Sequence, residues 1–258
     1  MARACANCPS ASPECAAAGI AIGIAGNPNC GKSALFNALT GIHQHTGNWP
    51  GVTVERKEGR FELGGQAVTV IDLPGIYSLD ALSTDERVSR DFLLAREADV
   101  IVNVVDAANL ERHLYFTMQL LEMELPMVVA VNMMDVARDR GIEVDTAALA
   151  AALGCPVVPV VAVTGEGLER LAGAILDVAM ERTPRGKMPA HQPVIEEAVD
   201  ELSSLMADGD AHNARWLGLI LLEGDGLAQS RACVVARERA GHWQTVIRVA
   251  EATEPDIA

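Results

Sequence analysis

The eight residues at positions 26–33, Gly-Asn-Pro-Asn-Cys-Gly-Lys-Ser, have the types and spacing of a loop that binds phosphate. An apolar, strand-like run precedes them at 20–25, and a helix-like run follows at 34–39. In such a loop the backbone N–H groups and the helix N-terminus attract phosphate, Lys32 reaches the β- and γ-phosphates, and Ser33 ligates Mg²⁺. A Gly-rich turn could match by chance, but both flanks favour a nucleoside triphosphate site.

Asp72 and Gly75 predict a second contact with the phosphates. They belong to the sequence Asp-Leu-Pro-Gly, which begins at the end of the apolar run 67–72. A carboxylate at a strand end can hold Mg²⁺ through water, and a glycine N–H can donate to the γ-phosphate. Such a pair is common by itself, but its position 40 residues after Lys32 is typical of a nucleotide site.

Asn132 and Asp135 indicate that the base is guanine. The Asp135 carboxylate can accept hydrogen bonds from both N1–H and the 2-amino group of guanine, a pairing that adenine cannot offer. Asn132 would brace the loop and contact the base edge. Lys is usual where Met133 stands, so we expect weaker stacking on the base and easier nucleotide exchange. The alternative for this spacing is a helix N-cap.

The segment that starts with Ala162 and Val163 is expected to complete the base site. It follows the apolar run 157–161, and one of its backbone N–H groups could bind O6 of guanine. A Ser is common at position 162, so the Ala in this chain bears on the order of the loop and on the selectivity for guanine.

Thr53 ends the run Gly-Asn-Trp-Pro-Gly-Val-Thr and lies 20 residues beyond Ser33. At this distance a mobile switch can place a Thr hydroxyl on Mg²⁺ while the γ-phosphate holds it, and can release it after hydrolysis. The alternative is a Thr in an ordinary surface loop.

We expect hydrolysis to be slow and stimulated by K⁺. Many GTP-hydrolysing proteins orient water with a Gln after Asp-x-x-Gly and use an Arg finger, but here Ile76 follows and no Arg is obviously placed. The Asn29 side-chain carbonyl could instead coordinate a monovalent cation, with carbonyls near Asn48 and Trp49 completing its shell. Main-chain groups and Thr53 would position the water. Alternatively, Asn29 is a turn residue that satisfies the loop backbone.

The candidate site follows from these motifs, with GTP or GDP, Mg²⁺ and K⁺ as its expected ligands. The residues expected to act in catalysis are Asn29, Lys32, Thr53 and Gly75. The residues expected to bind the nucleotide are Gly26, Asn27, Asn29, Cys30, Gly31, Lys32, Ser33, Ala34, Gly51, Val52, Thr53, Asp72, Gly75, Asn132, Met133, Asp135, Ala162 and Val163. The expected metal ligands are Ser33, Thr53 and Asp72 for Mg²⁺, and Asn29, Asn48 and Trp49 for K⁺.

The elements that must position these residues alternate between short apolar strands and longer amphipathic helices. This pattern predicts an α/β fold with a mainly parallel, doubly wound sheet, and the motifs above indicate that it is of the phosphate-loop GTPase type. Gly64-Gly65 predicts a hairpin and hence one antiparallel strand. The expected strands are 20–25, 54–63, 67–72, 100–106, 127–132 and 157–161. The expected helices begin near Lys32, Asp85, Leu110, Asp145 and Gly167.

The chain is expected to divide into three parts. Residues 1–18 form a flexible leader, whose Cys5, Cys8 and Cys15 are either inert or part of a metal or redox site that would need a fourth ligand. A GTPase domain covers 19–183. A small all-helical domain covers 184–258, and Gly209, Gly224-Asp225-Gly226 and Gly241 are expected to divide it into four helices.

Composition narrows the class of protein. The 258 residues carry a formal net charge of −15, so binding nucleic acid through a basic surface is not expected. No run approaches the roughly 18–20 apolar residues that span a bilayer, and the N-terminus lacks the apolar segment of a signal peptide. We therefore expect the chain as given to be soluble and cytosolic in character.

The motifs together resemble the N-terminal cytosolic part of the bacterial ferrous iron transport protein B family. The resemblance is carried by the loop at 26–37, by Gly-Asn-Trp-Pro-Gly-Val-Thr-Val-Glu-Arg-Lys at 47–57, by Asp-Leu-Pro-Gly-Ile-Tyr-Ser at 72–78, and by 103–107 and 109–112. It covers roughly residues 20–180, and the run at 47–57 is its most specific part.

This resemblance implies a G protein attached to a membrane permease that imports Fe²⁺ in bacteria. It also implies a regulatory helical domain that slows GDP release, small cytosolic accessory proteins as partners, and self-association into a homo-oligomer. The permease is absent from this chain, which we interpret as a fragment of the longer protein, located as a cytoplasmic domain at the inner membrane.

Other interpretations are compatible with the same motifs. A GTPase of ribosome or tRNA maturation shares Asn29 and the missing Gln, although the acidic charge and the run at 47–53 argue against it. A nucleotide-gated binding module is a third, in which hydrolysis only resets the switch. His43 and His45 suggest an iron site, but two His rarely complete a set of ligands, and a solvated loop is the simpler interpretation.

Overall fold

The computed structural model describes residues 19–41, 44–80, 83–181, 186–188, 190–210 and 212–253. The leader with Cys5, Cys8 and Cys15 lies outside the described residues, as does His43. The strands are β1 Ile20–Gly26, β2 Gln44–Asn48, β3 Glu55–Leu63, β4 Gln66–Asp72, β5 Val100–Asp106, β6 Met127–Asn132 and β7 Val157–Pro159. The helices are α1 Lys32–Thr40, α2 Thr84–Ala95, α3 Leu110–Glu122, α4 Met134–Asp139, α5 Thr146–Leu153, α6 Leu168–Glu181, α7 Pro193–Asp210, α8 Ala214–Glu223, α9 Gly226–Arg231 and α10 Val234–Thr253, with a 3₁₀ turn η2 at Ala107–Asn109.

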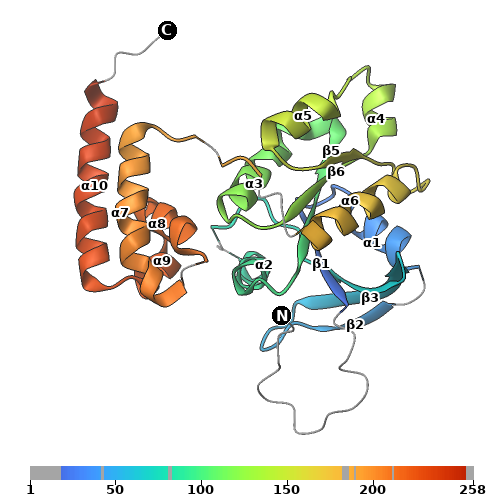
Figure 1. Cartoon of the computed structure of the whole chain (residues 1–258), viewed down its shortest axis with the longest axis horizontal. Helices are drawn as coiled ribbons and strands as arrows, with labels where there is room; N and C mark the ends of the chain where they lie inside the picture. The colour runs from blue at the N-terminus through green and yellow to red at the C-terminus, as the bar shows by residue number, and fades with distance from the viewer. Residues whose placement is uncertain are drawn as a thin grey trace, which may run out of the picture.

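The strands form one seven-stranded sheet in the order β2-β3-β4-β1-β5-β6-β7 (Figure 1). β1 pairs in parallel with β4 and β5, and β6 pairs in parallel with β5 and β7. β3 runs antiparallel to both of its neighbours. The predicted mainly parallel α/β sheet with one antiparallel strand is therefore confirmed.

Helices cover both faces of the sheet and separate two apolar cores. On one face α1 and α6 pack on β1, β4, β5 and β6, with Phe36 and Leu171 among the fully buried side chains. On the other face α2, α3 and α5 pack on the sheet, with Phe92 and Phe116 at the centre. β5 and β6 are buried along their whole length, as expected of central parallel strands that are covered on both faces.

The sequence did not predict two elements, β2 and α4. The residues of β2, Gln-His-Thr-Gly-Asn, are polar and largely exposed, so they lack the apolar alternation by which a strand is recognised. They pair only with β3 at the edge of the sheet. α4 has only six residues, which is too short to show helical periodicity.

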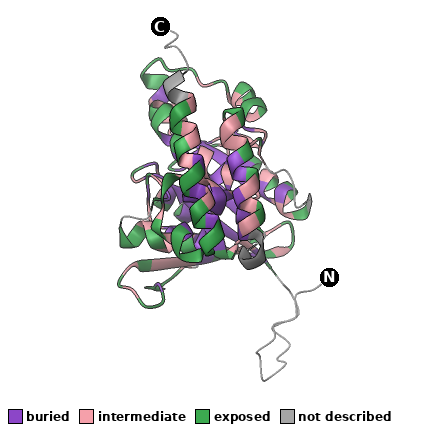
Figure 2. Cartoon of the chain, turned by 90° about the vertical axis from the view of Figure 1, so that its left-hand side faces the viewer, coloured by how far each residue is buried: buried purple, intermediate pink, exposed green. Residues whose placement is uncertain are grey.

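Helices α7 to α10 pack together beside α2 and α3. Figure 2 looks onto this bundle: the outer faces of α7 and α10 are largely exposed or half-buried, and the buried residues lie behind them. The expected division at Gly241 is wrong, because Gly241 lies inside α10, where an exposed glycine costs only about 1 kcal/mol relative to alanine. Gly224 does end α8, in the left-handed conformation, and Asp225 then caps α9.

Arg96 and Asn213 join the bundle to the sheet domain. Arg96 Nη2 donates to the carbonyl of Met123 at 2.8 Å and to the carbonyl of His212 at 2.9 Å. The Asn213 side chain, which is buried, donates to the carbonyl of Leu94 at 3.1 Å. The turn between α7 and α8 is thus attached to the ends of α2 and α3 through main-chain oxygens. None of the helices in the described ranges combines the length and apolar character that crossing a membrane requires.

Candidate functional site

Several of the predicted motifs lie in segments that follow parallel strands at the same edge of the sheet. β1, β4, β5, β6 and β7 point in the same direction, so the segments that follow them gather at their carboxyl ends. β1 is central, and the order of connections reverses beside it, which is where open α/β sheets bind ligands. The site described below is built from the segments after β1, β4, β6 and β7.

The loop after β1 wraps back on itself because three of its residues have positive φ. Gly26, Asn29 and Gly31 have φ of 148°, 64° and 92°. Asn tolerates the left-handed region better than most residues, and Asn29 is exposed, with no hydrogen-bond partner for its side chain among the described residues. Gly31 precedes α1, and no side chain caps this helix. Its first N–H groups, including those of Ser33 and Ala34, remain available to an anion.

Lys32 is folded into this loop. Its Nζ donates to the carbonyls of Gly26 at 3.0 Å and Asn27 at 2.8 Å, and the side chain is buried. Burial lowers the pKa of Lys32, while the nearby Cys30 and Asp72 act to raise it. Burial also raises the pKa of Cys30, so this thiol stays protonated and serves as a small apolar group under the loop.

Asp72 and Ser33 are brought together at the end of β4. Burial raises the pKa of Asp72, and Lys32 and a hydrogen bond with Ser33 act to lower it. Asp72 Oδ1 is buried and has no hydrogen-bond partner among the described residues. A carboxylate oxygen without a partner, next to a hydroxyl, matches the oxygen ligands that Mg²⁺ prefers. These two residues therefore fit a Mg²⁺ site.

Gly75 lies directly against Lys32. A Cβ at position 75 would be 2.7 Å from Lys32 Nζ and 3.1 Å from Pro28 Cα, so a larger residue would displace the ammonium. The next residue, Ile76, donates its backbone N–H to the carbonyl of Gly26 at 3.3 Å. The segments after β1 and β4 thus converge at the ammonium group.

Asn132 joins the phosphate-binding loop to the loop after β7. Its Nδ2 donates to the carbonyl of Cys30 at 3.0 Å, and its Oδ1 accepts from the N–H of Ala162 at 3.0 Å. The side chain is buried. A Cβ at Gly31 would overlap Asn132 Nδ2, so the glycine is required by this close approach as well as by its φ.

Asp135 and Met133 follow Asn132. Met133 has φ of 61° and precedes α4, so Asp135 falls in the first turn of that helix. The Asp135 carboxylate is half-buried and has no hydrogen-bond or ion-pair partner among the described residues. It does not act as the N-cap, which was the alternative reading of this spacing.

In the last loop, one of the two expected residues already uses its backbone donor within the protein. Ala162 is buried and its N–H is taken by Asn132. Val163 is 79% exposed, and its N–H has no acceptor among the described residues. Val163, rather than Ala162, is therefore the residue whose N–H is free to meet a base.

The segment with Thr53 does not meet the rest of the site. The Trp49 N–H donates to the carbonyl of Val54 at 2.9 Å, and the Trp49 carbonyl accepts from Val52 at 3.2 Å, which closes residues 49–54 into a tight turn. Trp49 packs edge-on against Phe92 of α2, with ring centroids 5.7 Å apart. Thr53 and Asn48 are exposed, and no contact of either with Asn29 is found among the described residues.

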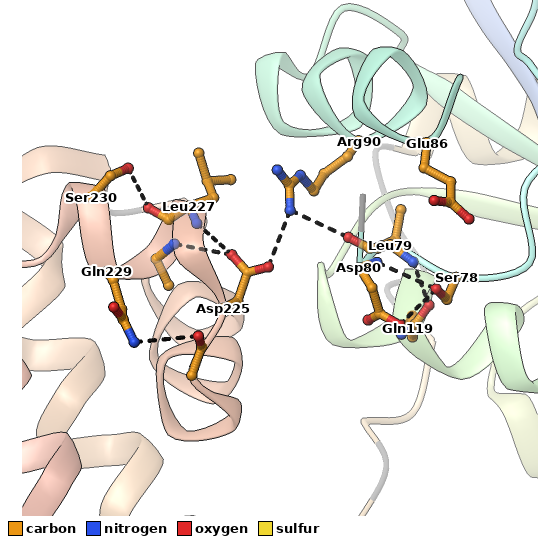
Figure 3. Close-up of polar contacts among 12 residues, drawn as sticks. Ser78, Leu79, Asp80, Glu86, Arg90, Gln119, Asp225, Leu227, Gln229 and Ser230 are labelled. Atoms are coloured by element: carbon orange, nitrogen blue, oxygen red, sulfur yellow. Dashed lines mark hydrogen bonds and ion pairs between the residues drawn. The ribbon is translucent and has the colours of Figure 1, made fainter. Parts of the chain in front are cut away.

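The sequence also gave no role to Arg90 and Asp225, which link α2 to the helical bundle (Figure 3). Arg90 Nη1 donates to Asp225 Oδ2 at 3.3 Å and to the carbonyl of Leu79 at 3.5 Å. Leu79 N–H donates in turn to Gln119 Oε1 of α3 at 2.9 Å. The segment that follows Gly75 is thus in contact with the bundle. The sequence signal for Asp225 was its position after Gly224, which is typical of a helix cap. Nothing in the sequence pointed to Arg90.

Asn103 and Asp106 in β5 are among the residues that carry the sequence resemblance, and both make hydrogen bonds within the fold. Asn103 Nδ2 donates to Thr117 Oγ1 of α3 at 2.7 Å, and Asp106 accepts from Ala108 N–H at 2.8 Å and from Asn109 Nδ2 at 2.6 Å. In the described part of the chain no group of three or more His, Cys, Asp or Glu side chains could hold a metal ion, and His45 is exposed on β2.

Comparison with known proteins finds similar sequences over most of the chain. The family described as "Ferrous iron transport protein B" matches residues 20–175. The Fe(2+) transporter FeoB of Escherichia coli K12 is 48% identical over 211 residues, which is 80% of this chain and 27% of that protein. The FeoB of Shigella flexneri matches equally well. The chain thus spans about a quarter of the length of these relatives.

Solved structures agree in fold. The cytosolic domain of L. pneumophila FeoB is 40% identical, with a TM-score of 0.77, and the alignment covers 87% of this chain and 88% of that one. A GDP-bound mutant of S. thermophilus NFeoB is 36% identical, with a TM-score of 0.82, and the alignment covers 90% of each chain. The similarity therefore includes the helical bundle as well as the sheet.

Proposed function

Since this chain belongs to the ferrous iron transport protein B family, we propose that it binds GTP at the edge of the sheet and hydrolyses it to GDP and phosphate. The observation that carries this proposal is the convergence of Lys32, Gly75 and Asp72 on one point over the loop after β1. A γ-phosphate at that point would meet a cation, a glycine N–H and a metal-binding carboxylate.

The base site is proposed to select guanine through Asp135. Within the described part of the chain its carboxylate and the N–H of Val163 have no partners; the carboxylate matches N1–H and the 2-amino group, and the N–H matches O6. Asn132 acts by holding the two loops in place, because both ends of its amide are already bonded to protein. The GDP in the similar S. thermophilus structure supports this assignment.

Ser33, Asp72 and Thr53 would hold Mg²⁺, which when bound neutralises charge on the phosphates. Ser33 and Asp72 are already adjacent, whereas the segment 49–54 has to leave α2 for Thr53 to arrive. Lys32 would move its hydrogen bonds from loop carbonyls to phosphate oxygens. Thr53 and main-chain groups next to Gly75 would then orient the attacking water.

Asn29 is proposed to take part in holding K⁺, with carbonyls near Asn48 and Trp49 completing the shell once the switch moves. Asn29 fits this role because its side chain is exposed and has no partner among the described residues. K⁺ supplies positive charge where an Arg finger would act.

In the whole protein, we propose that residues 19–183 form the GTPase domain and 184–258 a helical domain that regulates it. Their cycle would control a membrane permease for Fe²⁺ in the remainder of the longer protein, on the cytoplasmic side of the membrane. The relatives are Fe(2+) transporters, which supports this assignment. Small accessory proteins and other copies of the chain are further proposed partners.

The test is the rate of phosphate release from GTP, measured in K⁺ and in Na⁺ for the wild type and for Asn29→Ala. We expect hydrolysis by the wild type to be faster in K⁺ and hydrolysis by the variant to be slow in both salts. Arg60→Ala, a change at an exposed position of β3 away from the loop, is the control. Equal rates in both salts for the wild type would exclude the role of K⁺, and ATP turnover equal to GTP turnover would exclude guanine selection.

A further inference from the structure

Ser89 lies in the middle of α2, and its hydroxyl bonds outside its own helix. The side chain is 1% exposed, and Oγ donates to the carbonyl of Pro74 at 3.2 Å. A Ser or Thr hydroxyl within a helix commonly donates to the carbonyl four residues earlier. Thr40, Thr117 and Ser203 do so in α1, α3 and α7. The Ser89 hydroxyl instead fastens α2 to the segment that follows β4.

The segment 73–76, which contains Gly75, is held through its main chain. Leu73 and Ile76 donate their N–H groups to carbonyls of β1, at 3.0 and 3.3 Å. The Pro74 carbonyl is held by Ser89, and a proline has no N–H that could hold it in addition. The Gly75 N–H has no acceptor among the described residues. It is therefore available to a ligand, on a segment whose neighbouring main-chain groups are fixed.

The Ser89 hydroxyl determines which way this N–H points. The Pro74 carbonyl and the Gly75 N–H belong to one peptide unit, which is planar and trans, so the two groups point in opposite directions. Ser89 holds the carbonyl toward α2, which packs on one face of the sheet. The N–H is thereby directed away from α2, toward the side on which α1 begins with Lys32. A Cβ at Gly75 would be 2.7 Å from Lys32 Nζ, so the ammonium is an immediate neighbour of this peptide.

We propose that Ser89 is a positioning residue, which directs the Gly75 N–H at the γ-phosphate of GTP. The inference rests on the proposed function, and it adds to that site a buried residue that acts through Gly75. Without the hydroxyl, the peptide between Pro74 and Gly75 can rotate about the bonds on either side of it, and glycine permits many backbone conformations. The N–H would then spend part of its time directed away from the phosphate.

Only a nucleotide with a γ-phosphate should respond to Ser89. The guanine side of the site, formed by Asp135 and Val163, follows β6 and β7, whereas Ser89 bonds the segment after β4 on the other side of β1. The switch segment, residues 49–54, packs on Phe92 of α2, a contact that does not involve Ser89. A hydroxyl with a purely structural role would change the affinity for GDP and GTP alike, or for neither.

The test compares the dissociation constants of GDP and of guanylyl imidodiphosphate, a non-hydrolysable analogue that has a γ-phosphate, for the wild type and Ser89→Ala. Both are measured with Mg²⁺ and K⁺ present. We expect the variant to bind the analogue roughly 3- to 10-fold more weakly, which is what one intramolecular hydrogen bond is worth, and to bind GDP as the wild type does. GTP turnover at saturation should fall by a similar factor, since the same N–H faces the γ-phosphate in the transition state.

Ser203→Ala is the matched control, since Ser203 is also a helical serine whose hydroxyl donates to a carbonyl, but it lies on α7 in the bundle. It should bind both nucleotides like the wild type. Melting temperatures verify that the variants are folded. If Ser89→Ala does not fold, Ser89→Cys takes its place, because a thiol occupies similar space and is only a weak donor.

The proposal is overturned if Ser89→Ala binds the analogue as tightly as the wild type does. Equal weakening of GDP and of the analogue would overturn it too, because Ser89 would then act on the fold as a whole. A wild type that binds both nucleotides but does not hydrolyse GTP would contradict the proposed function instead, and the ratio of the two affinities would still decide the role of Ser89.

Discussion

The guanine side and the switch side of the candidate site are held by different kinds of contact. On the guanine side, the buried Asn132 amide bonds the Cys30 carbonyl and the Ala162 N–H, both at 3.0 Å. On the switch side, the Trp49 side chain is held by an aromatic ring and a guanidinium, and its N–H has no acceptor among the described residues. Directional bonds to backbone permit one arrangement, whereas ring contacts are more easily exchanged. The difference supports the proposal of a preformed base site beside a segment that moves during the nucleotide cycle.

Replacing Lys32, which lies between the guanine side and the switch side, should have the largest effect on GTP turnover. In Lys32→Ala the cation that meets the γ-phosphate is lost, and we expect GTP turnover to fall by ~100- to 1,000-fold, as for other groups that stabilise transition-state charge. Phosphate release at saturating GTP measures this. Lys187→Ala, which removes an exposed ammonium bonded to the Ala151 carbonyl, should leave turnover unchanged. Similar losses in both variants would contradict the assignment of Lys32.

A pair of glycine substitutions compares the two sides directly. Gly31 and Gly51 both have positive φ, 92° and 76°, but a Cβ at Gly31 overlaps Asn132 whereas a Cβ at Gly51 meets open space. Gly51→Ala carries only the backbone strain of about 1–2 kcal/mol. Gly31→Ala should add the loss of the Asn132 bridge, about 1–3 kcal/mol more, and weaken GDP binding.

Calorimetric GDP titration and thermal unfolding of both glycine variants provide the measurement. The preformed base site predicts that only Gly31→Ala loses GDP affinity. Equal losses in the two variants would mean that the switch segment contributes to GDP binding as much as the guanine side does.

Loosening the switch side alone should have a smaller effect. Arg56→Ala removes the cation over Trp49, a contact worth about 0.5–1 kcal/mol at a partly exposed site. We expect faster amide hydrogen exchange in residues 49–54 and unchanged exchange around Asn132. Arg60→Ala, at an exposed position of the same strand, is the control. Faster exchange at both sides would show that they are coupled rather than independent.

The smallest expected effect concerns the junction with the bundle. Glu223 is exposed at the junction, but partial desolvation of its carboxyl raises its pKa, with further contributions from Asp80 and Asp225 and an opposing one from His191. A raised pKa in the folded state means that the folded protein binds more protons than the unfolded chain. Glu223 therefore lowers the free energy of unfolding as the pH rises from about 4.5, the ordinary pKa of a Glu, through the raised pKa. Glu223→Gln should therefore increase the melting temperature at pH 7 but not at pH 4.

The control for this change is Glu169→Gln, an exposed glutamate on α6. It should leave the melting temperature unchanged at both pH values. A gain at pH 4 equal to that at pH 7 would exclude the titration of Glu223 as its cause.

Much of the fold could be predicted from the sequence because its strands are buried on both faces. β5 and β6 are apolar except for Asn103, Asp106 and Asn132, and Gly64-Gly65 marked the antiparallel hairpin. The edge strand β2 could not be found this way, because it is largely exposed among the described residues and polar residues suffice there. The helix break predicted at Gly241 was wrong for a related reason. The position is exposed and no described atom lies near its missing Cβ, so the helix loses no packing contact there.

The candidate site could be predicted from the sequence to a similar degree. Spacing alone brought together the loop after β1 and the residues Asp72 and Gly75, since all follow parallel strands. Spacing could not show that Ala162 gives its N–H to Asn132, because that depends on the packing of two loops. Nor could it show Trp49 against Phe92, since the two are brought together by the fold of a connecting segment.

The attachment of the helical bundle through Arg96 and Asn213 has a consequence for how the protein can change over evolution. Both side chains bind carbonyl oxygens, of Met123, His212 and Leu94, and every residue type supplies a carbonyl. The side chains at those three acceptor positions are thus free to drift without weakening these bonds. Only the two donors are constrained, so relatives can share this docking geometry while their bundles diverge in sequence.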